Sequence, residues 1–338
     1  MSPKDAAGTI QHAVLSRLKM RQLALLQAID RHRALNRVAN EMRLSQPAIT
    51  KALREVEDIF GTPLFTRSSR GLAPTAAGDA VLLHAKRWLA DVESTSHVLA
   101  AIDAGHGGRV RIGITTQVAQ ALLTAALKAL LGQSPRLSAF IIEGTTDQLV
   151  GRMLAGELDC AIGRSYEGDA PGIVQEAIYE QEPCLVVPAR NEKRLSRGPL
   201  DWAKLAELDW ILPPANTPMR RLYNTIFVTA GVPPPVPIME TISVRSMETV
   251  LGSEPNAIAI LPRDVVDELF KGGVAAPLAH RLDWKLPPVT FFCLRALAEQ
   301  PQMRGLAAAL RDAAKRLKQP RGATGGARMK SGIAESPT

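Results

Sequence analysis

Apolar residues recur at helical spacing through the first sixty residues of the chain. An apolar stripe within 20–29 predicts a first helix. A second, short helix is predicted over 36–42, and a third helix begins after Ser45. The third helix is expected to bury a row of residues at spacings of four, three and four, namely Ile49, Leu53, Val56 and Phe60. Ser45 is a good N-cap and Gly61 a natural C-terminal stop, so the pattern predicts helix, tight turn, helix.

Two short apolar pieces follow the third helix, over 62–75. They flank a Ser/Gly turn with Arg67 before it and Arg70 at its end. Short apolar segments around such a turn are typical of a β-hairpin. The helices and the hairpin together predict a winged helix-turn-helix.

A long helix is expected from Thr75 to about Ala104. Its apolar positions alternate at spacings of four and three, which is a heptad pattern: Val81, Ala85, Trp88, Val92, Thr95, Leu99 and Ile102. The pattern favours pairing with a second helix. The alternative is a single stripe packed on the chain's own body.

The remaining body alternates between strand and helix. Strands at 110–114, 138–143 and 159–163 enclose helices at 119–131 and 147–155, so a parallel sheet covered by helices is predicted. A second set of elements is expected at 184–187, 210–212, 219–230, 237–240, 244–253 and 257–261. A late strand at 289–294 and a helix at 302–318 suggest that the chain returns to the first lobe.

Charge is unevenly distributed along the 338 residues, whose formal net charge is +8. The segment 17–70 holds 11 Lys/Arg against 5 Asp/Glu, and 304–330 holds 8 against 1. A basic head suggests contact with a polyanion, although a solvated helix surface gives the same count. No apolar run reaches membrane-spanning length, no secretory signal is visible, and the cysteines are odd in number, so a cytoplasmic protein is expected.

The third helix leaves a polar face at its N-terminal end. A helix that follows a tight turn can enter the major groove, where Gln46 suits adenine and Lys51 suits guanine or a phosphate. The hairpin arginines suit the DNA backbone or the minor groove. The candidate DNA-binding residues are Ser45, Gln46, Pro47, Thr50, Lys51, Arg54, Arg67 and Arg70.

This head closely resembles the DNA-binding domain of LysR-type transcriptional regulators. The resemblance rests on the runs Leu44–Thr50, Leu53–Glu57, Gly61–Arg67 and Pro74–Gly78. It implies that Gln46, Pro47, Thr50 and Lys51 match the recognition-helix contacts and that Arg67 and Arg70 match the wing. It extends to the connecting helix and implies a dimer or a tetramer built as a dimer of dimers.

The body resembles the effector domain of the same family, which is similar to type 2 periplasmic binding proteins. The residues that carry this likeness are Arg109–Ile114, Gly156–Gly163 and Ile258–Pro262. The expected fold is therefore multidomain, α and α/β. Its predicted parts are an N-terminal extension (1–17), the winged helix-turn-helix (18–75), a linker helix and hinge (76–108), the two-lobed effector domain (109–318) and a disordered basic tail (319–338).

Polar residues follow the strands of both lobes where a ligand of an open α/β sheet is expected. The candidate effector-binding residues are Thr115, Thr116, Gln117, Thr145, Thr146, Arg164, Ser165, Thr241 and Ser243. Hydroxyls and helix N-termini suit a small carboxylate, but each Thr or Ser alone is also an ordinary helix cap. Arg164 is either the counter-charge of the anion or, with slight preference, an exposed arginine.

No catalytic or metal-binding motif occurs, so neither an enzyme nor a cofactor or metal is expected. The cysteines lie in apolar runs and are expected to be buried and inert. We expect a transcriptional regulator whose partners are promoter DNA, a small organic effector (a carboxylate or an aromatic compound), itself, and RNA polymerase as a further candidate, with no membrane. The alternatives are an architectural DNA-binding oligomer without effector and a solute-binding protein.

Overall fold

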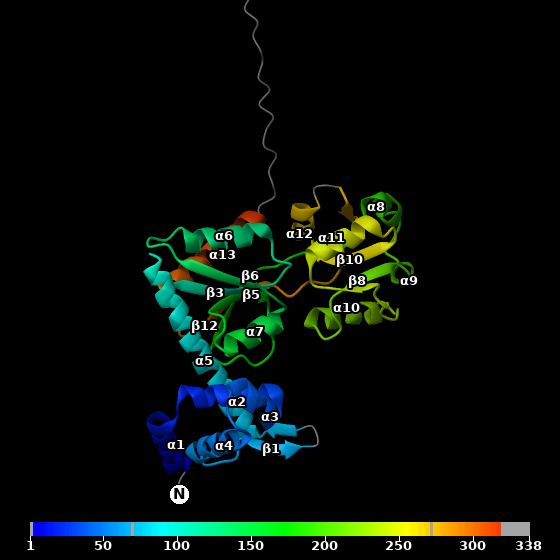
Figure 1. The fold of residues 1–338 in the computed structure, drawn as a ribbon. Helices are drawn as coiled ribbons and strands as arrows, with labels where there is room; N and C mark the ends of the chain where they lie inside the picture. The colour runs from blue at the N-terminus through cyan, green and yellow to red at the C-terminus, as the bar shows by residue number, and fades with distance from the viewer. Residues whose placement is uncertain (1–2, 69–70, 271–272, 319–338) are drawn as a thin grey trace, which may run out of the picture.

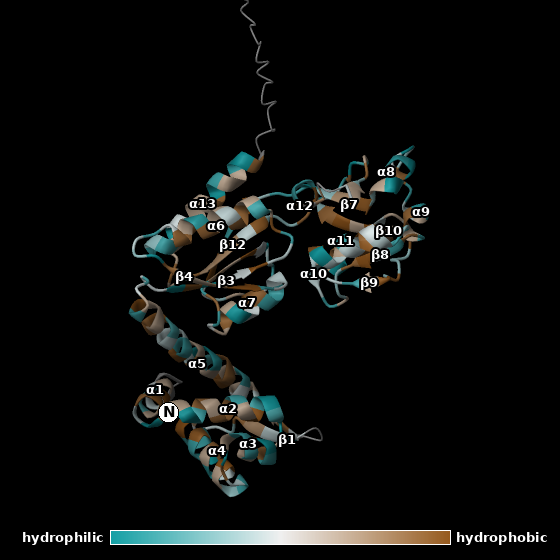
Figure 2. Cartoon of the chain, turned by 45° about the horizontal axis from the view of Figure 1, so that its top comes forward, coloured by the Kyte–Doolittle hydropathy of each residue, from teal (hydrophilic) through white to brown (hydrophobic). Residues whose placement is uncertain are grey.

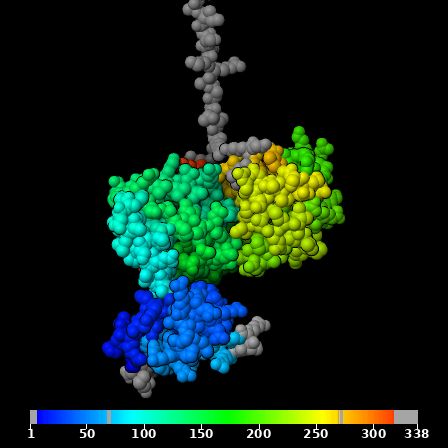
Figure 3. All heavy atoms as spheres, in the orientation of Figure 1, coloured from blue at the N-terminus to red at the C-terminus, as the bar shows by residue number. Residues whose placement is uncertain are grey.

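The computed structural model describes residues 3–68, 71–270 and 273–318. They form an N-terminal domain, one long helix and a two-lobed body (Figure 1). In the space-filling view the N-terminal domain meets the body at a narrow neck, whereas the two lobes lie directly against each other (Figure 3). The predicted multidomain α and α/β fold is confirmed.

The N-terminal domain packs helices and a hairpin around one apolar core. Its elements are α1 (Pro3–Arg17), α2 (Met20–His32), α3 (Leu35–Met42), α4 (Gln46–Phe60), β1 (Phe65–Ser68) and β2 (Gly71–Pro74). Ile49, Leu53 and Val56 of α4 are buried as expected, but the last buried position is Ile59 and Phe60 is only partly buried. Phe60 lies on the same face of the helix as Ile49, about three turns earlier, and still packs against the core.

The sequence predicts no element over residues 1–17, where the structure has α1 packed against α4. The periodicity gives little signal because apolar side chains of this helix face outward. Leu15 is 80% exposed and Ile10 is 40% exposed.

The long helix α5 (Ala76–Asp103) joins the domain to the body. Thr75 caps it by accepting a hydrogen bond from the Gly78 backbone N–H at 3.0 Å. The start of the predicted seam packs inside the chain, because Ala85 is fully buried on the N-terminal domain. Further along, Val92 and Leu99 are about half exposed. The apolar stripe is thus divided between the chain's own domain and an unpartnered surface.

The first lobe contains a five-stranded sheet of the described residues in the order β4-β3-β5-β12-β6. Its elements are β3 (Arg109–Ile114), α6 (Gln120–Leu131), β4 (Ser138–Glu143), α7 (Thr146–Leu154), β5 (Cys160–Arg164), β6 (Ile173–Tyr179), β12 (Val289–Leu294) and α13 (Pro301–Lys318). Strand β3 pairs in parallel with β4 and β5, as predicted. Strand β12 pairs with β5 and β6 in the antiparallel direction, so the chain does return to the first lobe.

The second lobe is built on the sheet order β11-β7-β10-β8-β9. Its elements are β7 (Pro183–Pro188), α8 (Ala189–Leu195), α9 (Trp202–Ala206), β8 (Asp209–Leu212), α10 (Pro218–Thr229), β9 (Met239–Glu240), α11 (Val244–Ser253), β10 (Ala257–Pro262), α12 (Arg263–Leu269) and β11 (Ala275–Pro277). The strands of both lobes are largely hydrophobic and lie between the helices (Figure 2). Buried clusters on both faces of each sheet form the cores.

Candidate DNA interface and interlobe seam

The N-terminal end of α4 is shaped by the turn before it. Ser45 Oγ accepts a hydrogen bond from the Ala48 N–H at 3.4 Å. Pro47 occupies the first turn, where a backbone N–H would have no acceptor within the helix, so its missing N–H costs nothing. Arg43 and Gly61 have positive φ values of 53° and 68° at the turn before α4 and at its end. These local features fix where the helix begins and ends.

The polar residues of α4 face away from the core. Gln46, Lys51 and Arg54 are exposed, and no ion pair involves them among the described residues. Thr50 is half-buried, and its hydroxyl donates to the Gln46 carbonyl at 3.1 Å. Cations without an ion pair, beside an exposed amide, can donate hydrogen bonds to phosphates and to base edges.

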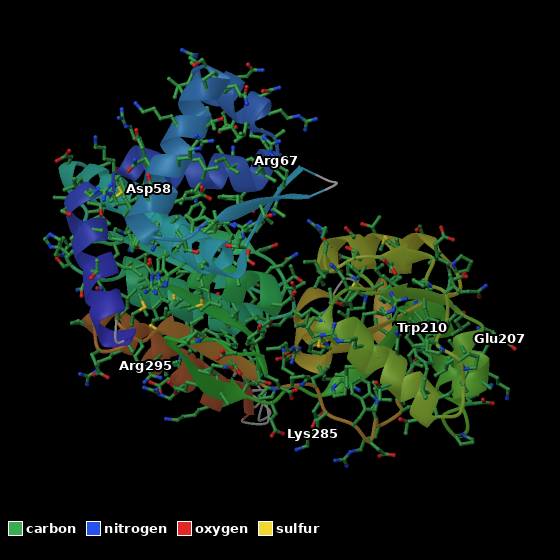
Figure 4. All side chains as sticks on the ribbon, turned by 90° about the horizontal axis from the view of Figure 1, so that it is seen from below. Asp58, Arg67, Glu207, Trp210, Lys285 and Arg295 are labelled. Atoms are coloured by element: carbon green, nitrogen blue, oxygen red, sulfur yellow. The ribbon has the colours of Figure 1, made fainter. Side chains whose placement is uncertain are left out.

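A glutamate side chain of α4 holds the hairpin next to this helix. Glu57 Oε1 accepts hydrogen bonds from the backbone N–H groups of Leu64 at 2.8 Å and Phe65 at 3.2 Å. Arg67 lies on β1, exposed, where the hairpin projects from the domain (Figure 4). Arg70 lies outside the described residues.

Arg43 is a cation that the sequence pattern did not single out. It lies in the turn directly before α4, is exposed, and has no ion pair in the described part of the chain. The sequence could have suggested it only as one more arginine of a basic head. Its position next to the N-terminal end of α4 makes it a further candidate contact.

The loops that carry the predicted effector residues meet at the seam between the lobes. The Thr116 hydroxyl of the first lobe donates to the Ile242 carbonyl of the second. Within the first lobe, a Cβ on Gly163 would lie 2.8 Å from Thr146 Oγ1 and 3.2 Å from Thr115 Cγ2. The loops after β3 and β4 therefore converge on the end of β5.

Several of the predicted hydroxyls serve the backbone. Thr146 Oγ1 accepts from the Arg164 N–H at 2.9 Å, and Thr241 Oγ1 accepts from the Ser243 N–H at 3.0 Å. Ser243 caps α11 by accepting from the Ser246 N–H at 3.3 Å. The capping role that competes with ligand binding is thus visible at these positions.

The remaining candidates make backbone contacts, two of them with the segments that join the lobes. Gln117 offers its carbonyl to Gln181 Nε2 at 3.3 Å, and the Ser165 N–H donates to the Pro288 carbonyl at 3.0 Å. The Thr145 N–H donates to Gln148 Oε1 at 3.1 Å. The segments around 181 and 288, which cross between the lobes, therefore touch the predicted residues.

The slight preference for an exposed Arg164 is wrong. Its side chain is only 7% exposed, and its Nη1 donates to the Pro287 carbonyl at 2.8 Å. Burial lowers the pKa of Arg164, whereas the neighbouring Tyr223, Tyr179 and Asp264 oppose that shift. Strand β5 carries the arginine inward because its end is covered by the second lobe and the connecting segment.

Two carboxylates of α12 also hold the seam, and sequence reasoning missed both. Asp264 accepts hydrogen bonds from the Tyr179 hydroxyl at 2.6 Å and from Gln181 Nε2 at 2.8 Å. Glu268 Oε2 accepts from the Gln120 N–H at 2.7 Å, at the N-terminus of α6. No local sequence signal marks such contacts, because the partners are 83 to 148 residues apart.

Other candidate sites are weaker. A hollow of about 570 Å³ lies between α5 and α7, but cations (Lys86, Arg152) and carboxylates (Glu143, Glu157) line it together, so it favours no ligand charge. Over the described ranges, no cluster of His, Cys, Asp or Glu could hold a metal ion. In the same ranges, no helix is long and apolar enough to cross a bilayer.

Two family models match consecutive parts of the chain. A family described as bacterial regulatory helix-turn-helix protein, lysR family, matches residues 20–79, and the LysR substrate binding domain matches residues 103–315. The chain is 32% identical over 300 residues to the HTH-type transcriptional regulator GbpR of Azospirillum brasilense, covering 88% of this chain and 87% of that one.

The overall fold is similar to that of CbnR, a LysR family transcriptional regulator. The TM-score is 0.58 at 20% identity, covering 88% of this chain and 99% of CbnR. For the structure of full-length CbnR complexed with its target DNA, the TM-score is 0.57 at 20% identity, and the coverage of both chains is the same.

Proposed function

Because the chain belongs to the LysR family of transcriptional regulators, we propose that α4 reads a promoter operator in the major groove and that the hairpin lies on the flanking backbone. The observation that carries this proposal is the exposed N-terminal half of α4, whose Lys51 and Arg54 lack ion pairs among the described residues. The proposed contacts are Ser45, Gln46, Pro47, Thr50, Lys51, Arg54, Arg67 and Arg70, with Arg43 added from the structure.

The same proposal includes a dimer formed through α5. Val92, Leu99 and Ile102 are 47, 58 and 51% exposed in one chain, which is costly for large apolar side chains in water. A two-fold pair would cover them and would place two α4 helices in successive major grooves. A homotetramer would follow from pairing two such dimers.

A small organic effector is proposed to bind at the interlobe seam. The predicted residues there belong to loops of both lobes, so a ligand held between them would favour one lobe arrangement over another. That change would alter the spacing of the paired N-terminal domains and the geometry of the DNA. At a promoter in the cytoplasm, RNA polymerase would be the partner that senses this geometry.

Fluorescence anisotropy on promoter fragments, over a series of salt concentrations, tests the DNA proposal. The wild-type chain should bind selected fragments, and Gln46→Ala/Lys51→Ala should lose that selectivity. Losing one phosphate contact should also reduce the slope of log K against log salt by about 1. Lys315→Ala, a change of an exposed lysine on α13, is the charge-matched control. A double variant as selective as wild type would refute the major-groove assignment.

A further inference from the structure

Three buried hydrogen-bond donors at the interlobe seam have no acceptor among the described residues. They are Arg164 Nη2, the Tyr223 hydroxyl and Trp284 Nε1. Arg164 is 7% exposed and Tyr223 is 1% exposed, so bulk water does not readily solvate these groups. An unpaired buried donor is unfavourable, and more so when it is charged.

Two contacts and one electrostatic interaction link these donors to one another. Arg164 Nη1 donates to the Pro287 carbonyl at 2.8 Å, and Pro287 is three residues from Trp284 in the segment that joins the lobes. The rings of Trp284 and Tyr223 meet edge to face with centroids 6.1 Å apart. Among the charged and phenolic groups that act on Arg164, Tyr223 has the largest effect on its pKa. The three donors therefore belong to one region.

The three groups also come from three different parts of the body. Arg164 ends β5 of the first lobe, Tyr223 lies on α10 of the second, and Trp284 lies on the connecting segment. Figure 4 shows the neighbouring Lys285 at the boundary of the two lobes. A ligand that all three donors reached would contact both lobes at once.

No carboxylate of the described residues lies within ion-pair distance of Arg164. The nearby Asp264 already accepts hydrogen bonds from Tyr179 and Gln181. A buried guanidinium without a carboxylate partner is unfavourable, and an anion would relieve this. A carboxylate provides two acceptor oxygens and one negative charge, which match a guanidinium edge and neutral donors.

We propose that Arg164 Nη2, the Tyr223 hydroxyl and Trp284 Nε1 form a subsite for the carboxylate group of a small organic acid. This assignment rests on the proposed effector function and names the chemical class that the seam takes. Occupation of the subsite stabilises the arrangement in which the lobes lie together, because the anion is bound by both lobes and the connector.

The test uses the full chain with acetate and benzoate as probes and the neutral acetamide and benzamide as matched controls. Melting temperature and calorimetric binding are measured at constant ionic strength set with sodium chloride. The carboxylates should raise the melting temperature of the wild-type chain, and the amides should not. Tyr223→Phe, which removes only the unpaired hydroxyl, should weaken carboxylate binding about tenfold or more.

Stability of the unliganded variants provides a second readout. Tyr223→Phe should melt at the same temperature as wild type or higher, because its hydroxyl has no partner to lose. Tyr179→Phe should melt lower, because that hydroxyl donates to Asp264 at 2.6 Å. The proposal is overturned if no carboxylate stabilises wild type beyond its amide, if Tyr223→Phe binds like wild type, or if it melts as low as Tyr179→Phe.

These outcomes are separate from those of the DNA proposal. Selective DNA binding by the wild-type chain is measured without any carboxylate, so its failure counts against the regulator's DNA contacts. A negative carboxylate result counts against this subsite alone.

Discussion

Glu57 on α4 holds Leu64 at the entry to the hairpin, with its Oε1 2.8 Å from the Leu64 backbone nitrogen. The same oxygen accepts from the Phe65 N–H at 3.2 Å. One carboxylate therefore sets the hairpin relative to α4, and with it the distance between the two proposed DNA-binding elements.

Glu57→Ala should lower the free energy of unfolding by about 1–3 kcal/mol, because two partly buried N–H groups lose their acceptor. DNA affinity should fall as well, since the hairpin is no longer held in place. Chemical denaturation and anisotropy measure the two effects. Glu55→Ala is the matched control, because Glu55 is exposed on the same helix. Equal behaviour of the two variants would contradict this role of Glu57.

Arg43→Ala should weaken binding to all DNA fragments by a similar factor, because an arginine before the helix is placed for a phosphate rather than a base. The slope of log K against log salt should drop by about 1. Arg245→Ala, on the exposed surface of α11, should leave the slope unchanged. A change of sequence preference in Arg43→Ala would instead indicate a base contact.

Features that depend on neighbouring residues in the chain can be predicted from the sequence. Features that depend on contacts with distant segments cannot. Ser45, Thr75 and Gly61 cap or end helices through neighbours in the chain, and they lie where the pattern predicts. The burial of Arg164 is different, because segments more than a hundred residues away cover it. The short α8, α9, α12 and β11 were also missed, since segments this short carry too few periods to be recognised.

Leu99→Lys/Ile102→Lys should convert the dimer to a monomer, because charges would enter the exposed apolar stripe of α5. Size-exclusion chromatography with light scattering measures the mass. His97→Lys, on the opposite side of this helix turn, is the control and should remain dimeric. A dimer that survives the double change would place the interface elsewhere.

Thr116→Val/Thr145→Val should abolish the response to an effector while sparing DNA binding. In the double variant Thr116 loses its hydrogen bond to the Ile242 carbonyl across the seam, and Thr145 loses its hydroxyl at the N-terminus of α7. DNA binding should persist, because both positions lie outside the N-terminal domain. Thr225→Val, an exposed position on α10, is the control. An intact response in the double variant would show that the effector lies elsewhere.

The cysteine thiols should be unreactive in the folded chain. Cys160 and Cys293 are register partners on β5 and β12, yet both are free and buried, as is Cys184. Burial raises the pKa of Cys293 to about 11 and of Cys184 to about 12, from an ordinary value of 9.0. A thiol reagent at pH 8 should therefore label the native chain slowly and should label three thiols once the chain is unfolded.

The same shifts predict how stability depends on pH. The folded chain keeps these thiol protons at pH values where the unfolded chain has released them. Their contribution to stability is therefore complete below about pH 9. It should decline as the pH rises toward 12, the folded-state value for Cys184. Denaturation midpoints measured from pH 7 to pH 11 test this, with Cys184→Ala as the comparison, because its midpoint should fall less steeply at high pH. For the labelling prediction, a contradicting result would be rapid labelling of the native chain at pH 8, which would show that a thiol is accessible and ionised.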